Sequence, residues 1–293
     1  MAQIAPHRRR FGRLGPNILL IVAAIFFISP LVSMARFALQ NVPVFRLGRS
    51  TLFEKWSLSG TTKAFHEKSF APTVLLSLRL ALGTVILTLG LLIPTALLVH
   101  VKVPKARSIV EFFTLLPYMV PPIALVAGVI GFVRPNARWF VASNYSLIPF
   151  YAILALPFTY RSIDAGIRAI DVRTLIDAAR SLGAGWGTTL WRALLPNLRS
   201  AVISSSFLTA TVVLGEFTMA QVLLKRTFPQ FLAEYGAREP QGGMGLALLT
   251  LVATTALLGL LTILSRRKAG RAHGGVSDTP HAGLIRLGGS DVQ

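Results

Sequence analysis

The sequence predicts an all-α integral membrane protein with six transmembrane helices and one short cytoplasmic helix between the fourth and the fifth. Three observations predict this fold class. Of the 293 residues, 53% are hydrophobic and only 14% are charged, whereas soluble domains carry about 25% charged residues. The hydrophobic residues form long runs, and the basic residues gather mainly at the ends of these runs, as they do in membrane proteins. Residues 171–196 interrupt the runs with the apolar period of a surface helix.

Residues 18–37 form an almost charge-free apolar run after a basic start, and a run of this length can cross a bilayer as a helix. A secretory signal peptide is the alternative, but its apolar centre has only about 7 to 15 residues. We therefore favour an uncleaved first transmembrane helix. The predicted organisation is a cytoplasmic segment at 1–16, a transmembrane domain at 17–265 and a disordered cytoplasmic tail at 266–293, which is rich in Gly, Ser, Pro and His.

Proline interrupts the next two predicted helices. The second helix runs from Thr73 to Val101 and contains Pro94, which removes one backbone hydrogen bond and is expected to bend it. The third helix, residues 109–133, contains the proline-rich stretch 116–122 near the middle of the membrane. A break exposed to lipid would leave backbone groups without hydrogen-bond partners, so this stretch is predicted to face protein or a water-filled path.

Three further spans complete the prediction, at residues 145–160, 198–224 and 244–264. Six spans place both termini and the 171–196 segment on the same side of the membrane. The segments on that side hold more Lys and Arg than the segments on the other side. By the positive-inside rule, this excess predicts that the shared side is the cytoplasm.

The 171–196 segment predicts two short amphipathic helices. In the first, apolar residues recur at steps of three and four and therefore form one stripe. These residues are Val172, Leu175, Ile176, Ala179 and Leu182. Charged residues, among them Arg173 and Asp177, fall on the opposite face, and Gly183 follows where a left-handed helix cap favours glycine. At 1.5 Å per residue this helix is about 16 Å long, too short to cross a bilayer core of about 30 Å. With a second short helix over 188–196, it predicts a docking surface for another protein.

The spacing of this segment resembles the EAA loop of binding-protein-dependent ABC import permeases. The family pattern is Glu-Ala-Ala, three residues, Gly, nine residues, Ile, one residue and Leu-Pro. At the same spacing the sequence has Asp177-Ala178-Ala179, Gly183, Ala193 and Leu195-Pro196. Two positions depart from the pattern, because Asp177 replaces the glutamate and Ala193 stands where isoleucine is usual. The resemblance extends over residues 72–265.

The resemblance implies that this loop is the coupling helix of a permease and sits in a cleft of a cytoplasmic ABC ATPase dimer. It also implies a second permease subunit, identical or related, an extracytoplasmic solute-binding protein, surrounding membrane lipid and no cofactor. In the implied mechanism, ATP closes the ATPase dimer, draws two coupling helices together and turns the spans from inward-facing to outward-facing. The residues expected to couple to the ATPase are Leu175, Ile176, Asp177, Ala178, Ala179, Leu182, Gly183, Leu195 and Pro196.

The stretch from Leu214 to Thr218, Leu-Gly-Glu-Phe-Thr, resembles spermidine/putrescine-type permeases most closely. The implied solute is therefore a polyamine, with sulfate, ferric iron, thiamine and phosphonate as alternatives. The implied location is the bacterial inner or plasma membrane, with both termini in the cytoplasm.

Glu216 is the one acidic residue deep in an apolar run. A carboxylate within a membrane span is costly and is by default a functional candidate, so Glu216 is predicted to line the translocation path or to form part of an outer gate. The alternative is a helix-to-helix contact in which this acid pairs with Tyr118 or an arginine. The residues predicted for the path and gate are Tyr118, Met119, Gly215, Glu216, Thr218 and Gln221.

Composition also excludes several functions. The absence of cysteine excludes disulfides and thiol chemistry. The five histidines lack metal-ligand spacing, and no phosphate-binding loop is present. The chain is therefore predicted to be a transport subunit and not an enzyme, with ATP hydrolysis in a partner chain. The net charge of +19 is not clustered on a soluble domain, so nucleic acid is not an expected partner.

Two other classes of protein stay open. A secondary transporter would be expected to carry inverted repeats and ion-coupling acids near the midplane, and neither is evident. A non-transporting membrane anchor could recruit a cytosolic protein through the same loop. For Asp177 alone, the alternative role is an exposed ion pair with Arg173 or Arg180 on its own helix.

Overall fold

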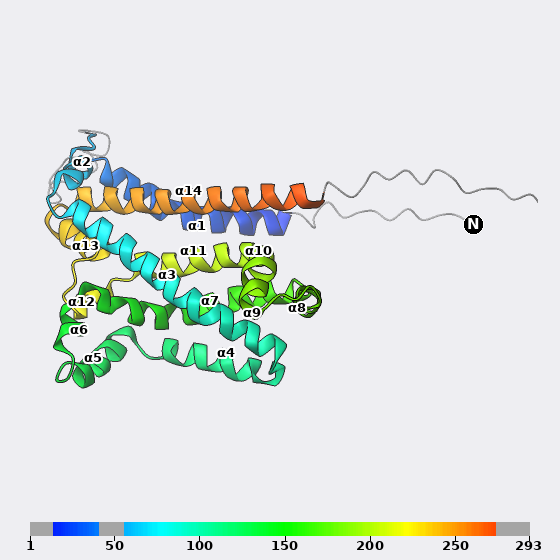
Figure 1. Cartoon of the computed structure of the whole chain (residues 1–293). Coiled ribbons are helices and arrows are strands. Elements are labelled where there is room, and N and C mark those ends of the chain that lie inside the picture. Colours follow the sequence, from blue (N-terminus) through cyan, green and yellow to red (C-terminus); the bar gives the residue numbers. More distant parts are fainter. Residues whose placement is uncertain (1–13, 41–55, 274–293) are drawn as a thin grey trace, which may run out of the picture. The chain divides into compact units, whose positions relative to one another are not determined.

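The computed structural model describes residues 14–40 and 56–273 of the chain. Every regular element in these ranges is a helix, and one isolated antiparallel bridge joins Gln40 to Trp56 (Figure 1). The chain divides into two units, Met1–Leu251 and Val252–Gln293. Among the described residues, the second unit contains only the C-terminal part of the last helix.

Within the described ranges, five helices have more than sixteen residues. They are α1 (Leu14–Ala38), α3 (Phe70–Val101), α7 (Leu147–Arg168), α11 (Arg199–Gly215) and α14 (Pro240–His273). Shorter helices connect them: α2 (Ser59–His66), η4 (Pro104–Ala106), α4 (Arg107–Leu115), η5 (Leu116–Met119), α5 (Pro122–Val133), α6 (Arg138–Ala142), η6 (Asn144–Ser146), α8 (Val172–Ser181), α9 (Trp186–Thr188), η7 (Thr189–Leu194), α10 (Leu195–Asn197), α12 (Thr218–Val222) and α13 (Phe228–Arg238).

By length and composition, two of the described helices can cross a membrane on their own, over Gly15–Ala38 and Phe70–Val101. Two bent helix pairs raise the number to four if each pair is one span. The pairs are Pro104–Met119 with Pro122–Val133, bent by 91°, and Trp186–Asn197 with Arg199–Gly215, bent by 79°. The six predicted spans fall on α1, α3, α4 with α5, α7, α11 and α14. Among the described residues, α7 and α14 are not in the set that meets this criterion of length and composition.

The structure corrects the predicted course of two spans. The fifth span, predicted as one helix over 198–224, ends at Gly215, because Glu216 takes an extended backbone conformation (φ −81°, ψ 120°). A new short helix, α12, begins two residues later. The fourth span continues beyond the predicted end at Tyr160 as far as Arg168. The second span is one continuous helix, as predicted, because α3 continues through Pro94 without a break in the helix.

Helices α3, α7 and α11 pack against one another and form the centre of the first unit. Gly166 allows α7 to approach α11 closely, because a Cβ atom at this position would lie 2.2 Å from the Cβ of Ala201. Further along the same pair, the hydroxyls of Thr159 and Thr209 share a buried hydrogen bond of 2.7 Å. Small residues and hydroxyl bonds of this kind are typical of helix contacts within membranes.

The predicted terminal segments lie largely outside the described residues. Helix α1 begins at Leu14 and α14 continues to His273, so the predicted boundaries at residues 16 and 266 fall within helices. The boundaries of the three predicted segments stay predictions.

Candidate functional site

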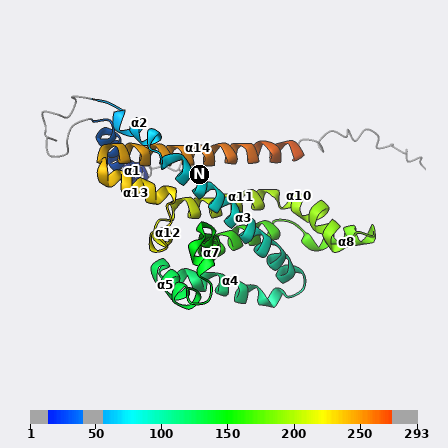
Figure 2. The same ribbon diagram turned by 60° about the vertical axis from the view of Figure 1, so that its left-hand side comes forward.

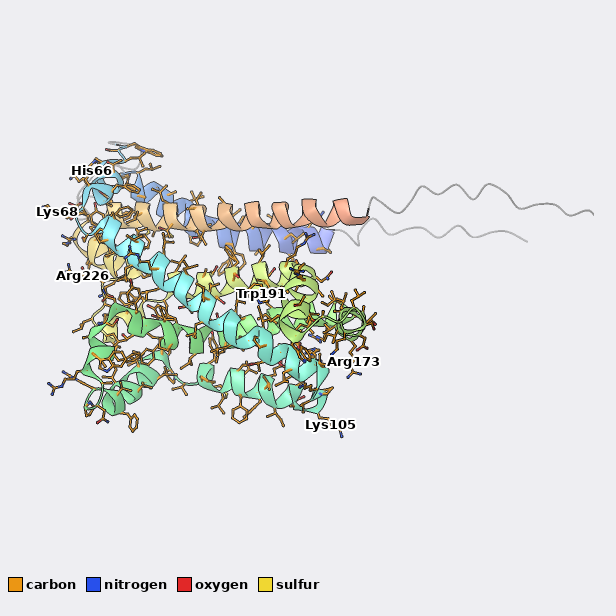
Figure 3. All side chains as sticks on the ribbon, in the orientation of Figure 1. His66, Lys68, Lys105, Arg173, Trp191 and Arg226 are labelled. Atoms are coloured by element: carbon orange, nitrogen blue, oxygen red, sulfur yellow. The ribbon has the colours of Figure 1, made fainter. Side chains whose placement is uncertain are left out.

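The loop 171–196 lies at one end of α7 and α11, and α12 lies at their other end (Figures 1 and 2). The predicted residues of the loop and those at 215–221 therefore fall into two separate regions, whereas Tyr118 and Met119 lie in η5, between α4 and α5. Figure 3 shows Arg173 and Lys105 projecting at the end that carries the loop, and Arg226, Lys68 and His66 at the opposite end. The two regions are the coupling loop and the helix break at Glu216.

Asp171 fixes the start of α8. Its carboxylate accepts hydrogen bonds from the backbone N–H of Thr174 at 3.2 Å and from the Thr174 hydroxyl at 2.7 Å. An acidic residue at this position satisfies an N–H group that the helix leaves free. The two bonds from Thr174 lower the pKa of the exposed Asp171 carboxyl below its usual range. Asp171 therefore defines the position at which α8 begins.

Gly183 fixes the end of α8, as the sequence predicted. Its φ of +79° lies in the left-handed region, where the backbone of a residue with a Cβ atom is strained and that of glycine is not. The N–H of Ala184 donates to the carbonyl of Ala179 at 3.0 Å, and the N–H of Gly183 donates to the carbonyl of Arg180 at 2.8 Å. The first of these bonds closes the helix end in the manner of a Schellman motif.

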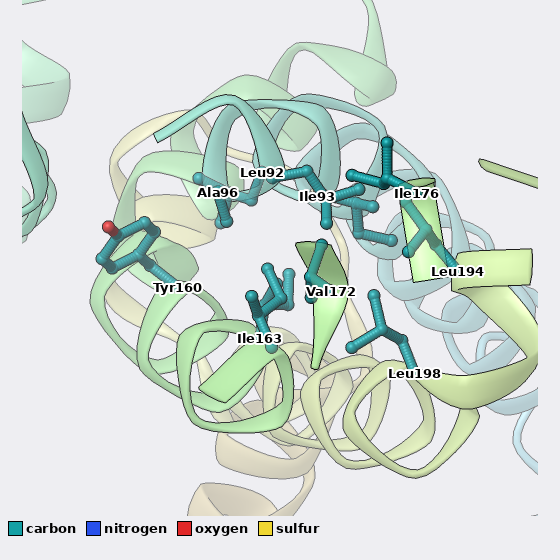
Figure 4. Close-up of a cluster of buried hydrophobic side chains, with 11 residues drawn as sticks. Leu92, Ile93, Ala96, Tyr160, Ile163, Val172, Ile176, Leu194 and Leu198 are labelled. Carbon is teal, nitrogen blue, oxygen red and sulfur yellow. The ribbon is translucent and has the colours of Figure 1, made fainter. Parts of the chain in front are cut away.

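One face of α8 rests on a buried apolar cluster, which we call the socket (Figure 4). Val172 and Ile176 are the buried side chains that α8 contributes to it. The other buried members come from α3, α7, the second half of the loop and the residue just before α11: Leu92, Ile93, Ala96, Leu97, Tyr160, Ile163, Ile167, Leu194 and Leu198. Full burial of an aliphatic side chain is worth about 1.5–3 kcal/mol, so the socket holds α8 against the bundle.

The predicted apolar stripe is correct in part. Leu175 packs against the socket as a partly buried residue, and Ala179 is half-buried. Leu182 is 88% exposed, because α8 ends at Ser181 and the backbone at Leu182 leaves the helical conformation (φ −86°, ψ 7°). The last member of the stripe therefore points away from the socket and adds an apolar side chain to the exposed surface.

The exposed surface of α8 carries Asp177 and Ala178, together with Arg173 and Arg180. In the described part of the chain, no basic group lies within 4.0 Å of the Asp177 carboxylate. The alternative role of this acid, an ion pair on its own helix, is therefore not observed. Arg180 instead lies over the ring of Trp186, 5.6 Å from its centre, an arrangement that attracts a cation to the ring face.

The second half of the loop is less regular than the predicted helix. Residues Thr189–Leu194 form a π-helix between the two short α-helical segments α9 and α10. Leu195 packs against the socket as a partly buried residue, whereas Pro196 is exposed. Single π turns of this kind occur often at functional sites.

The second region is the break after α11. Glu216 is 8% exposed, and both of its carboxylate oxygens lie 3.0 Å from the backbone N–H of Met219, which donates to them. The hydroxyl of Tyr151 faces the same carboxylate without hydrogen-bond geometry. Glu216 therefore caps α12, and its partners are backbone N–H groups and not Tyr118.

The other predicted path residues differ in exposure. Gly215 and Gln221 are exposed and Thr218 is half-buried. Tyr118 and Met119 lie in η5, at the break of the third span, and are 49% and 78% exposed. The Tyr118 ring contacts Phe158 edge-on, with centroids 5.4 Å apart. Within the described residues, no hydrogen bond or ion pair joins Tyr118 or Met119 to Glu216.

Sequence reasoning missed a buried charged cluster beside the socket. Asp164, 4% exposed, places Oδ2 at 2.8 Å from Nη2 of Arg107 and at 3.0 Å from Nη2 of Arg168, and Oδ1 at 3.4 Å from Nε2 of His100. We call these four residues the Asp164 cluster. Its one signal in the sequence was an acid four residues before an arginine at the end of an apolar run, because the other partners are distant along the chain.

These features define a class: a helical membrane protein with a short amphipathic helix seated between two spans. Residues 87–270 match the family described as "Binding-protein-dependent transport system inner membrane component". The chain belongs to this family, and it is a permease subunit of an ABC importer. The predicted family and fold class are therefore confirmed. A protein of this family is a transport permease and is not itself an enzyme.

Curated relatives and a solved structure agree with this assignment. The chain is 28% identical over 204 residues to the molybdenum transport system permease protein ModB of Mycobacterium tuberculosis, covering 64% of this chain and 77% of that protein. It is 27% identical over 113 residues to the methionine import system permease protein MetP of Bacillus subtilis, covering 39% of this chain. The matched region spans about half of MetP, 48% of its length.

The solved structure is a crystal structure of a bacterial ABC transporter involved in the import of the acidic polysaccharide alginate. The TM-score is 0.68, with 89% of this chain and 99% of that chain covered. At 15% sequence identity this likeness shows the fold alone.

Proposed function

We propose that this chain forms one half of the translocation path of an importer, and that α8 is the surface on which a separate cytoplasmic ATPase docks. A solute-binding protein delivers the solute on the other side of the membrane, and a second permease subunit, identical or related, completes the path. Both termini and the loop 171–196 lie in the cytoplasm. ATP hydrolysis belongs to the partner chain.

The observation that carries this proposal is the two-sided character of α8. One side is buried through Val172 and Ile176, so that a force on the helix passes to the bundle. The other side presents Asp177, Ala178 and Leu182 to solvent without partners in the described chain that would occupy them. A fixed helix with a mixed polar and apolar exposed face suits reversible contact with a protein cleft.

The test is ATP-dependent uptake into vesicles that contain the assembled transporter. We expect Leu182→Asp or Asp177→Arg to abolish stimulated ATP hydrolysis and uptake, because each change alters the exposed face without entering the socket. Val103→Asp is the matched control, since Val103 is 48% exposed in the turn after α3 but lies outside the loop. Uptake that follows an ion gradient and ignores ATP would contradict the proposal and favour a secondary transporter.

For the solute, we propose a small molecule delivered by the binding protein, with a polyamine as the first ligand to test. The resemblance of residues 214–218 supports the polyamine, whereas the names of ModB and MetP mention molybdenum and methionine. Glu216, which would favour a cation if it lined the path, is buried as a helix cap in this conformation. A calorimetric screen of the partner binding protein with spermidine, molybdate, sulfate, ferric iron and methionine decides among them.

The path residues follow from the same proposal. We place Tyr118 and Met119 at the break of the third span and Gly215, Thr218 and Gln221 around the break of the fifth, with Glu216 holding the second break in shape. Breaks in a span are tolerated where they line protein or water. Labelling of single cysteines at Met119 and Gln221 with a water-soluble thiol reagent tests this, and protection in both inward- and outward-facing states would contradict it.

A further inference from the structure

The Asp164 cluster lies directly beside the socket on which α8 rests. Asp164 follows Ile163 directly and precedes Ile167 by three residues. Both isoleucines are buried in the socket, together with Val172 and Ile176 of α8. A displacement of α8 therefore acts on the turn of α7 that carries Asp164.

The cluster links that turn to α4 through the hydrogen bond from Arg107 to Asp164, and His100 of α3 lies beside the carboxylate without a hydrogen bond to it. His100 lies in the last turn of α3 and Arg107 is the first residue of α4, while Arg168 belongs to α7 itself. The side chain of Asp164 is 6% exposed, against 36% for Arg107 and 53% for Arg168. The carboxylate is thus the buried centre, and the two guanidinium groups reach it from the solvent side.

Apolar contacts in the socket are non-directional and do not fix how helices move past one another. Hydrogen bonds between charged groups are directional, and burial strengthens them. Between α7 and α4 the described chain has one further ion pair, Arg161 with Glu111 at 3.3 Å, whose side chains are 62% and 37% exposed. An exposed pair of this kind contributes little, so the buried cluster is the stronger link.

We propose that Asp164 is a positioning residue that makes the broken third span move together with α7 when α8 is displaced. Helix α4 leads directly into η5, where Tyr118 and Met119 lie. The cluster therefore connects the coupling loop to the break in the third span. This inference rests on the proposed function, in which an ATPase displaces α8.

Arg107→Gln is the decisive variant. It removes the charged link to α4, while Asp164 keeps Arg168 at 3.0 Å, so that the buried carboxylate retains one cationic partner. Glu111→Gln is the matched control, because it removes the exposed pair between the same two helices. Arg107→Lys is the conservative variant that restores a cation at this position.

The measurement uses the natural absence of cysteine. Spin labels on single introduced cysteines at Phe113 in α4 and Ser181 in α8 report the distance between these helices in the assembled transporter, in lipid nanodiscs, without nucleotide and with ATP and vanadate. A second pair, one label at Ser181 and one on the matching helix of the second permease subunit, reports whether ATP draws the two helices together.

We expect one 113–181 distance, unchanged by ATP and vanadate, in the unmodified chain, in Glu111→Gln and in Arg107→Lys. In Arg107→Gln the distance changes with nucleotide, and ATP hydrolysis stimulated by the binding protein falls about 2- to 30-fold, the range for residues that modulate coupling, while unstimulated hydrolysis is retained.

An unchanged distance and full stimulation in Arg107→Gln would overturn the inference, as would an equal effect of Glu111→Gln. If Arg107→Gln does not assemble, Arg107→Met, which also removes the charge but keeps a long side chain, applies the same test with the same labels. A distance between the two coupling helices that ignores ATP in the unmodified transporter would instead refute the proposed function, and the two failures are thereby distinguished.

Discussion

The two regions at opposite ends of α7 and α11 each contain a buried carboxylate, and the chain satisfies the two in different ways. Glu216, at the helix break, accepts hydrogen bonds from the backbone three residues ahead, at Met219. Asp164, beside the socket, accepts a hydrogen bond from Arg107 in α4 and forms an ion pair with Arg168 in its own helix. The first acid shapes a short stretch of backbone, whereas the second joins distant segments. Removal of the two charges should therefore have effects of very different size.

Asp164→Asn has the largest expected effect. The change leaves Arg107, Arg168 and His100 around a neutral side chain, and the loss of one member of a buried ionic group is strongly destabilising. We expect a loss of about 3 kcal/mol in the free energy of unfolding, the low end for buried pairs, because both guanidinium groups also reach solvent. Thermal unfolding of the purified chain in detergent measures it.

Glu216→Gln is the direct comparison for that variant. Glutamine keeps an oxygen that can accept from Met219, so the expected loss is about 1 kcal/mol, that of one hydrogen bond. Equal unfolding temperatures for the Asp164 and Glu216 variants would show that the two carboxylates do not differ in the way described here.

Close packing near the Asp164 cluster gives the next effect. Gly166→Ala places a methyl group against Ala201 in α11 and should cost about 1–3 kcal/mol through overpacking. Gly90→Ala in α3 is the control, since a Cβ atom there meets nothing within 4 Å. Unfolding in a graded series of denaturing detergent ratios compares the two, and a loss in Gly90→Ala as large as in Gly166→Ala would argue against the close contact of α7 with α11.

A smaller effect is expected at the end of α8. Gly183→Ala puts a side chain at φ +79°, a conformation that costs about 1–2 kcal/mol for a residue with a Cβ atom. Gly187→Ala, four residues later, has open space around its Cβ position and no positive φ and should be neutral. Hydrogen–deuterium exchange of the peptide covering 172–182 measures the local stability of α8. Equal exchange in both variants would show that the Gly183 cap does not stabilise this helix.

The smallest effect concerns pH. Because hydrogen bonds from Thr174 lower the pKa of Asp171 in the folded chain, the stabilisation by this cap is fully present above the usual aspartate pKa of about 3.9. It is lost as the pH falls through the lower pKa of the folded state. Exchange in the first turn of α8, corrected for its intrinsic pH dependence, should therefore rise only in acid, and Asp171→Ala should remove this dependence. Asp177→Ala, at an exposed acid that caps nothing, should leave it intact.

The comparison also explains how much of the molecule could be predicted. Local signals worked: the period of Val172 and Ile176 predicted the buried face of α8, and Gly183 predicted its end. The long apolar runs predicted the spans. Each of these features depends on residues within a few positions of one another.

Features that depend on distant residues were missed. Arg107 and Asp164 are 57 positions apart, and a single sequence offers no spacing rule for such a pair.

Leu182 was assigned to the buried stripe because its period is right, but the glycine cap ends α8 first. The break at Glu216 lies in a run of apolar residues, and hydropathy alone cannot distinguish a continuous helix from one that an acid interrupts.

The exposed position of Leu182 has a wider implication. Because the residues that anchor α8 and those that it offers to a partner are separate sets, substitutions in the second set leave the anchoring unaffected. Recognition of a different ATPase can then be acquired through a few surface changes while the membrane-embedded part stays as it is. Chimaeric transporters that exchange motor subunits between related systems should accordingly be obtainable by grafting Asp177, Ala178 and Leu182 alone.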